Sequence, residues 1–140
     1  MDLIVQLKQQ HVEILHFFKA IGDEMAKGDV EDNYLIEELN NLKDFLIAHL
    51  ALEDRMLYPS FEMSKFKEAQ NLGKKFSTEM TAISKVAMIF FEKYNNMILS
   101  DLLKNAKFKK EADLIITTVK RRVGIEESIL YPAYDKYCRK

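Results

Sequence analysis

Apolar residues recur at every third or fourth position along four long stretches of this sequence, and this spacing constrains the fold most. The first stretch places Leu7, Ile14, Phe18 and Ile21 on one helical face. Only 4 glycines and 2 prolines occur in 140 residues, so long helices are favoured over a turn-rich sheet fold. We expect helices near residues 2–27, 33–58, 66–103 and 108–137. The third helix could instead begin at Gly73.

Turn residues separate the predicted helices. Gly28 follows the first apolar stretch, as a glycine past a helix end does, and Asp32 or Asn33 can cap the second helix. Pro59 restricts the residue before it, so the second helix should end or kink near Tyr58. Because the connections are short, neighbouring helices should be antiparallel. The predicted fold class is therefore all-α, an up-down-up-down antiparallel four-helix bundle.

The composition is that of a globular protein, with 48 % apolar and 31 % charged residues. The 21 Lys and Arg nearly balance the 22 Asp and Glu, so we expect neither nucleic acid nor a membrane surface as a partner. The longest apolar runs are far shorter than a bilayer span. Cys138 has no partner for an internal disulfide, and the first residues do not resemble a signal peptide. We expect residues 1–140 to form a single cytoplasmic domain.

The second and fourth predicted helices end in similar segments. One reads EDRMLYP from Glu53, and the other reads EESILYP from Glu126. This repeat predicts a helical hairpin used twice. The tyrosines of the two segments, Tyr58 and Tyr131, are expected to close one end of the bundle.

Ionisable side chains interrupt the apolar stripes. His11 is in phase with the stripe of the first helix. His49 and Glu53 lie four residues apart on the second helix, as do Arg122 and Glu126 on the fourth, so each pair shares one face. Burial of such groups is costly unless they pair or bind a metal. A His and a Glu one turn apart, facing other helices, is typical of iron sites in bundles. The candidate metal ligands are therefore His11, His49, Glu53 and Glu126.

These residues resemble the hemerythrin-like, or HHE cation-binding, domain family. The family pattern has a His on helix one, His-x-x-x-Glu before an aromatic-Pro pair on helix two, a His on helix three, and a second His-x-x-x-Glu before an aromatic-Pro pair on helix four. The resemblance extends over nearly the whole chain. It implies a non-haem di-iron centre that binds oxygen, senses oxygen or nitric oxide, or handles iron. The family's ligand positions match His11, His49, Glu53 and Glu126.

Two positions depart from the family pattern. Met80 occupies the position of the helix-three His, and Arg122 that of the helix-four His. In the family these two histidines belong to the same iron, so one half of the site looks intact and the other half lost. We expect Met80 and Arg122 to point into the same internal site as the four candidate ligands.

Three states of this site are compatible with the sequence. In the first, one metal ion is held by His11, His49 and one or both glutamates. In the second, no metal binds, and the Arg122 guanidinium bridges the carboxylates by forked hydrogen bonds. In the third, a di-iron centre survives, which the permanent charge of Arg122 opposes. We predict zero or one ion per chain, with iron as the expected metal.

Three classes of function follow. The first is a hemerythrin-like domain with a partly degenerate metal site, used for sensing or storage, with oxygen or nitric oxide as candidate ligands. The second is a metal-free bundle in which Arg122 replaces the metal, acting as an interaction or signalling module with a protein partner. The third is an enzyme, such as a mononuclear iron oxygenase. It has the least support, because no substrate pocket can be read in the sequence.

Overall fold

The computed structural model describes residues 2–27 and 34–139, and every regular element within these ranges is a helix. The π-helical turns are labelled η. In chain order the elements are α1 (Leu3–Ala26), α2 (Tyr34–Leu52), η1 (Glu53–Leu57), α3 (Tyr58–Glu62), α4 (Lys67–Tyr94), α5 (Leu99–Lys104), α6 (Phe108–Ile125), η2 (Glu126–Leu130) and α7 (Tyr131–Tyr137).

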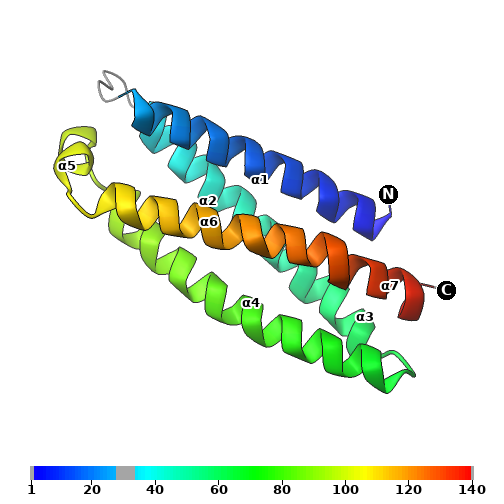
Figure 1. The fold of residues 1–140 in the computed structure, drawn as a ribbon. Helices are drawn as coiled ribbons and strands as arrows, with labels where there is room; N and C mark the ends of the chain where they lie inside the picture. The colour runs from blue at the N-terminus through cyan, green and yellow to red at the C-terminus, as the bar shows by residue number, and fades with distance from the viewer. Residues whose placement is uncertain (1, 28–33, 140) are drawn as a thin grey trace.

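These elements form four long rods that run alternately up and down (Figure 1). The first rod is α1, the second is α2 with η1 and α3, the third is α4, and the fourth is α6 with η2 and α7. Helix α1 packs on α2, α2 on α4, α4 on α6, and α6 on α1, which closes the bundle. Both chain ends lie at the same end of the bundle, and α5 lies at the other (Figure 1). The predicted fold class is confirmed.

The predicted apolar stripe of α1 lies inside the bundle. Asp2 caps the N-terminus of this helix, because its carboxylate accepts a hydrogen bond from the backbone N–H of Ile4 at 2.9 Å. No described helix is both long and apolar enough to cross a membrane. The stripe residues are at most 2 % exposed: Leu7, Ile14, Phe18 and Ile21.

The second helix was expected to end or kink near Tyr58. Regular α-helix is interrupted just before this residue, at Glu53–Leu57, and the rod then continues through Pro59 to Glu62. The reason is the π-helical turn η1, in which the backbone N–H of Tyr58 bonds to the carbonyl of Glu53, five residues earlier. Proline in an α-helix lacks an N–H and clashes with the carbonyl four residues earlier. The wider turn relieves that clash and places Pro59 in the first turn of α3, where a missing N–H costs little. The turn η2 does the same before Pro132.

The third rod also differs from the prediction. Helix α4 ends at Tyr94, and the short α5 follows separately. Gly73 does not begin a helix, because it lies within α4, where the ring of Phe61 packs directly on it. A Cβ atom at this position would overlap the Cβ of Phe61, so the close approach of α3 and α4 requires glycine. The predicted turn after Gly28 and the cap at Asp32 or Asn33 lie outside the described residues.

Candidate metal centre

Five ionisable side chains from three of the four rods are buried in the interior of the bundle. They lie in phase with the apolar stripes, so the same periodicity that buries leucine buries them. Each is between 1 % and 4 % exposed: His11 on α1, His49 on α2, Glu53 at the start of η1, Arg122 on α6 and Glu126 at the start of η2.

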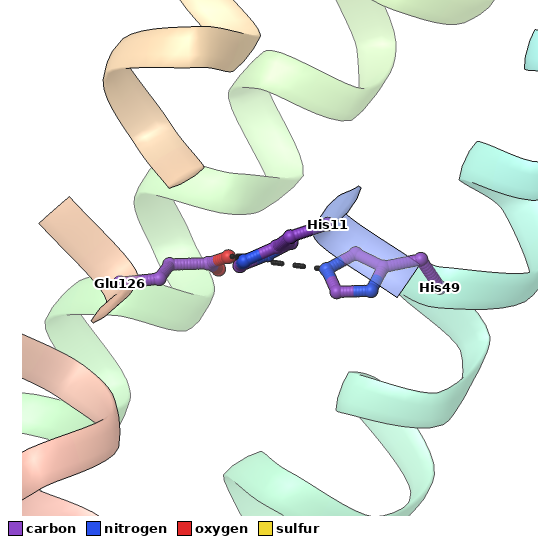
Figure 2. Close-up of side chains that lie close together, drawn as sticks. All are labelled: His11, His49 and Glu126. Atoms are coloured by element: carbon purple, nitrogen blue, oxygen red, sulfur yellow. Dashed lines mark hydrogen bonds and ion pairs between the residues drawn. The ribbon is translucent and has the colours of Figure 1, made fainter. Parts of the chain in front are cut away.

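Two imidazoles and a carboxylate meet at the centre of this group (Figure 2). The Nε2 atom of His11 lies 3.0 Å from Oε1 of Glu126, and the Nε2 atom of His49 lies 3.9 Å from the same oxygen. His49 Nε2 is also 3.5 Å from Oε1 of Glu53. The ligand atoms of His11, His49 and Glu126 all lie within 4.8 Å of one another. This His/His/Glu cluster can bind a metal ion.

The outer nitrogen of each imidazole has its own hydrogen-bond acceptor. His11 Nδ1 lies 2.8 Å from Oε2 of Glu127, and His49 Nδ1 lies 2.7 Å from Oε1 of Gln10. Because these oxygens accept, each Nδ1 can donate its ring proton outward. In a neutral imidazole of this tautomer the Nε2 lone pair points into the cluster and can bind a metal ion, whereas in an imidazolium Nε2 donates to Glu126. Metal-binding histidines are commonly held in this way, with an acceptor on the nitrogen that does not bind the metal.

The donor set fits a cation. A carboxylate oxygen only accepts hydrogen bonds, so the short contact between His11 Nε2 and Glu126 requires a proton or a metal ion between the two atoms. Oε1 of Glu53 is buried and has no hydrogen-bond partner among the described residues. A buried acceptor without a donor is costly, and a metal ion would satisfy it. Two imidazoles and two carboxylates suit a divalent ion such as Fe²⁺ or Zn²⁺.

The two carboxylates have opposite pKa shifts. Burial raises the pKa of Glu53 well above its usual range, and the charge of Glu126 raises it further. Burial acts on Glu126 in the same direction, but hydrogen bonds from His11 and His49 outweigh it and lower the pKa of Glu126 well below its usual range. Burial also lowers the pKa of His49. Two neighbouring buried carboxylates cannot both ionise easily without a cation, which a bound metal supplies.

The π-helical turn η2 places the Tyr131 hydroxyl beside Glu126. In a π turn, residues five apart are stacked along the helix, so Tyr131 returns over Glu126. The Tyr131 hydroxyl lies 3.4 Å from Oε1 of Glu126, 3.1 Å from Oε2 of Glu53 and 3.2 Å from Nε2 of His11. Burial raises the pKa of Tyr131, so the hydroxyl keeps its proton and donates it to a carboxylate. Tyr131, which we expected to close one end of the bundle, thus contacts the candidate ligands directly.

Arg122 lies on the other side of Glu126. Its Nε donates to Oε2 of Glu126 at 3.2 Å, while Oε1 of that carboxylate faces the histidines. Its Nη2 donates to the Tyr58 hydroxyl at 3.2 Å and to the Phe76 carbonyl at 2.9 Å. The guanidinium also lies 4.6 Å from the centre of the Phe76 ring. Of the two carboxylates that the guanidinium bridges in the metal-free state considered above, Glu126 is the one that Arg122 contacts.

Two neighbouring residues of α4, Met80 and Glu79, lie in different places relative to the site. Met80 is buried, at 6 % exposed, and it lines a small cavity of about 150 Å³ with Leu50 and Asp54. Glu79 is the chain neighbour of Met80 on α4. Its half-exposed carboxylate lies 3.7 Å from Nη1 of Arg122 at the edge of the site.

Gln10 and Glu127 were not found from the sequence. Each is the chain neighbour of a candidate ligand, Gln10 of His11 and Glu127 of Glu126, and each contacts the histidine of another rod. Neither lies on an apolar stripe, so periodicity gives no signal for them. Their adjacency to ligand positions is the only sequence feature that could have indicated them.

A comparison with protein-family models gives a match over residues 2–134 to the model described as hemerythrin HHE cation binding domain. A search of curated proteins and a search of solved structures found no match.

Proposed function

This chain belongs to the hemerythrin HHE cation-binding domain family, and we propose that it binds a single divalent metal ion, iron, for sensing or storage. The ligands are His11, His49, Glu53 and Glu126. One ion in a chain of 16.4 kDa is a small cargo, so sensing is the better-supported use.

One observation supports this proposal above the others. The Nε2 atoms of His11 and His49 both face Oε1 of Glu126, and their Nδ1 atoms both have acceptors outside the cluster. Both imidazoles thus turn Nε2 toward the same carboxylate oxygen and are held there through Nδ1, which gives a prearranged set of metal-binding atoms.

The limit to one ion follows from Arg122. The guanidinium bonds to Oε2 of Glu126, the oxygen that a second ion would need if this carboxylate bridged two metals. A permanent positive charge in that place repels a second cation. Met80 likewise replaces a histidine of the family pattern with a thioether, a poor ligand for ferrous iron.

When bound, an iron ion with two imidazoles and carboxylates supplies open positions at which a small molecule such as oxygen or nitric oxide can bind. The protein's own residues prepare this place. Glu127 and Gln10 orient the imidazoles, and Tyr131 donates to Glu53 and keeps that carboxylate turned inward. The bundle core around them excludes water.

The test is a metal count. Protein purified under anaerobic conditions after growth with iron should contain up to one iron per chain by elemental analysis, and apoprotein should take up one Fe²⁺ in equilibrium dialysis. The His11→Ala and His49→Ala variants should lose the ion, and Met80→Leu should keep it. Two ions per chain, or an ion retained in His49→Ala, would contradict the proposal.

A metal-free interaction or signalling module is the second candidate. The Tyr131 hydroxyl favours it, because it already links His11, Glu53 and Glu126 by hydrogen bonds without a cation. Arg122 likewise compensates the charge of Glu126. This candidate predicts that dialysis with Fe²⁺ or Zn²⁺ leaves no bound ion and that a chelator does not change the thermal stability.

A further inference from the structure

The two oxygens of Glu126 face opposite sides of the site. Oε1 faces the histidines, at 3.0 Å from His11 and 3.9 Å from His49. Oε2 accepts from Nε of Arg122 at 3.2 Å. One carboxylate thus connects the candidate metal ligands to a guanidinium, as a bridging carboxylate connects two metal ions.

The Arg122 charge is fixed in position. The side chain is 4 % exposed, its Nη2 donates to the Phe76 carbonyl and the Tyr58 hydroxyl, and its plane lies near the Phe76 ring. An arginine side chain does not lose its proton in proteins. The guanidinium can therefore neither move away from a bound ion nor become neutral.

The charged groups around the site come from several elements. The acidic side chains among them are Glu53 on η1, Glu126 and Glu127 on η2, and Glu79 on α4. The Glu79 carboxylate is 47 % exposed and 3.7 Å from Nη1 of Arg122, so water screens it. Glu127 is 39 % exposed and lies on the far side of the His11 ring. Arg122 is a buried permanent cation of this cluster, and its buried partner is Glu126. Because Glu126 is also a candidate metal ligand, one carboxylate would have to balance the charges of both the guanidinium and the ion.

We propose that Arg122 makes the site selective for the charge of the bound metal ion. Its positive charge favours a divalent ion over a trivalent ion. The inference rests on the proposed function, since it requires that one ion binds. Oxidation of Fe²⁺ to Fe³⁺ adds a unit of positive charge beside a buried guanidinium, where electrostatic repulsion is stronger than in water. In this oxidation the bound iron gives one electron to an external acceptor, and no covalent bond of the protein forms or breaks. Arg122 therefore keeps bound iron ferrous.

The test is the midpoint potential of the iron-loaded protein, measured by spectroelectrochemistry, with the electrode as the electron acceptor. Arg122→Gln should lower the potential, so that at the wild-type midpoint the ratio of Fe³⁺ to Fe²⁺ rises roughly tenfold. Arg122→Lys keeps the charge and should stay close to the wild type. Arg121→Gln is the matched control, because Arg121 is the exposed neighbour on the same helix. An unchanged potential in Arg122→Gln would overturn the inference.

A second measurement needs no variant and is not affected if Arg122→Gln fails to fold. Wild-type apoprotein is dialysed against Zn²⁺ and, separately, against the redox-inert trivalent ion Ga³⁺. We expect one Zn²⁺ per chain and at most about a tenth as much Ga³⁺. Equal retention of the two ions would overturn the charge selectivity and leave the metal site intact. Retention of neither Zn²⁺ nor Fe²⁺ would overturn the proposed function, and the inference with it.

Discussion

Arg122 donates a hydrogen bond from Nε to Oε2 of Glu126 at 3.2 Å, one turn along the same rod, and both side chains are almost completely buried. At the corresponding place in the first half of the chain, His49 lies one turn before Glu53. The two halves of the chain thus differ, with a neutral imidazole in one and a permanent cation in the other. This asymmetry determines the metal stoichiometry that we propose and the cost of changing Arg122.

Removal of the Arg122 side chain should destabilise the metal-free protein. Arg122→Ala leaves the buried charge of Glu126 without its nearest cation and removes the donor to the Phe76 carbonyl. Loss of one partner of a buried ion pair costs roughly 3–5 kcal/mol of unfolding free energy. Urea denaturation followed by circular dichroism measures this loss. Arg121→Ala, at an exposed position, should change the free energy by less than about 0.5 kcal/mol. A loss below about 1 kcal/mol in Arg122→Ala would show that the pair is not required.

Restoring the two missing histidines should add a second ion. The Met80→His and Arg122→His changes together supply two imidazoles to the half of the site that lacks them and remove the repelling cation. We expect the double variant to bind two ions per chain in equilibrium dialysis with Fe²⁺, whereas each single variant binds at most one. If the double variant gains no ion, these two positions are not the sites of lost ligands.

Glu127 should strengthen metal binding although it is not a ligand. Its carboxylate accepts from His11 Nδ1 at 2.8 Å, which fixes the ring and leaves Nε2 free for the ion. Loss of such a partner typically weakens metal affinity by about 10–100-fold, so Glu127→Ala should bind Zn²⁺ more weakly by this factor in a competition titration with a chromogenic chelator. Glu13→Ala removes an equal charge at an exposed place on α1 and serves as the control. Equal affinities of the two variants would show that orientation of His11 does not depend on Glu127.

The sequence predicted the fold class and the inward direction of the site side chains, because both depend on helical periodicity. His11, His49 and Glu126 lie on apolar stripes, and burial of those stripes brings the three side chains together. Their role as metal ligands remains a prediction. The family resemblance that the sequence indicated is confirmed by the match over residues 2–134.

The π-helical turns account for the differences between prediction and structure in the second and fourth rods. Pro59 was expected to end or kink the second helix near Tyr58, and the wide turn before it interrupts the α-helix but lets the rod continue to Glu62. The α-helical spacing rule does not describe side-chain directions within a π turn. It therefore gave no reason to place Tyr131 over Glu126, or Glu127 against His11. Contacts between residues far apart in the chain have no spacing signature that one sequence can display.

The way in which the stability of the protein falls at acidic pH should depend on Glu111, which lies far from the metal centre. Its carboxylate accepts from the Tyr94 hydroxyl at 2.5 Å and from Lys93 at 3.1 Å, and these bonds lower the pKa of Glu111 below its usual value. A lowered folded-state pKa stabilises the protein above the unfolded value, near pH 4.5, and this contribution is lost as the pH falls through the folded value. Glu111→Gln should therefore be less stable than the wild type at pH 7, with the difference shrinking toward pH 3. Melting temperatures across this range test it, with Glu92→Gln, exposed on α4, as the control. A difference that does not depend on pH would contradict the assignment.

Three glycines that lie within helices should respond to alanine in opposite directions. At Gly73 an added Cβ would overlap the Cβ of Phe61, so Gly73→Ala must push α3 away from α4. Overpacking of this kind costs roughly 1–3 kcal/mol. At Gly22 and Gly124 an added Cβ meets nothing within 4 Å, and alanine is the better helix former by roughly 0.5–1 kcal/mol, so both changes should stabilise the protein. Urea denaturation of the three variants gives the comparison directly.

Since α3 begins directly after η1, Gly73→Ala should also weaken Zn²⁺ binding, whereas Gly22→Ala should not. If the Gly73→Ala variant is as stable as the wild type, α3 and α4 are not packed as closely as described.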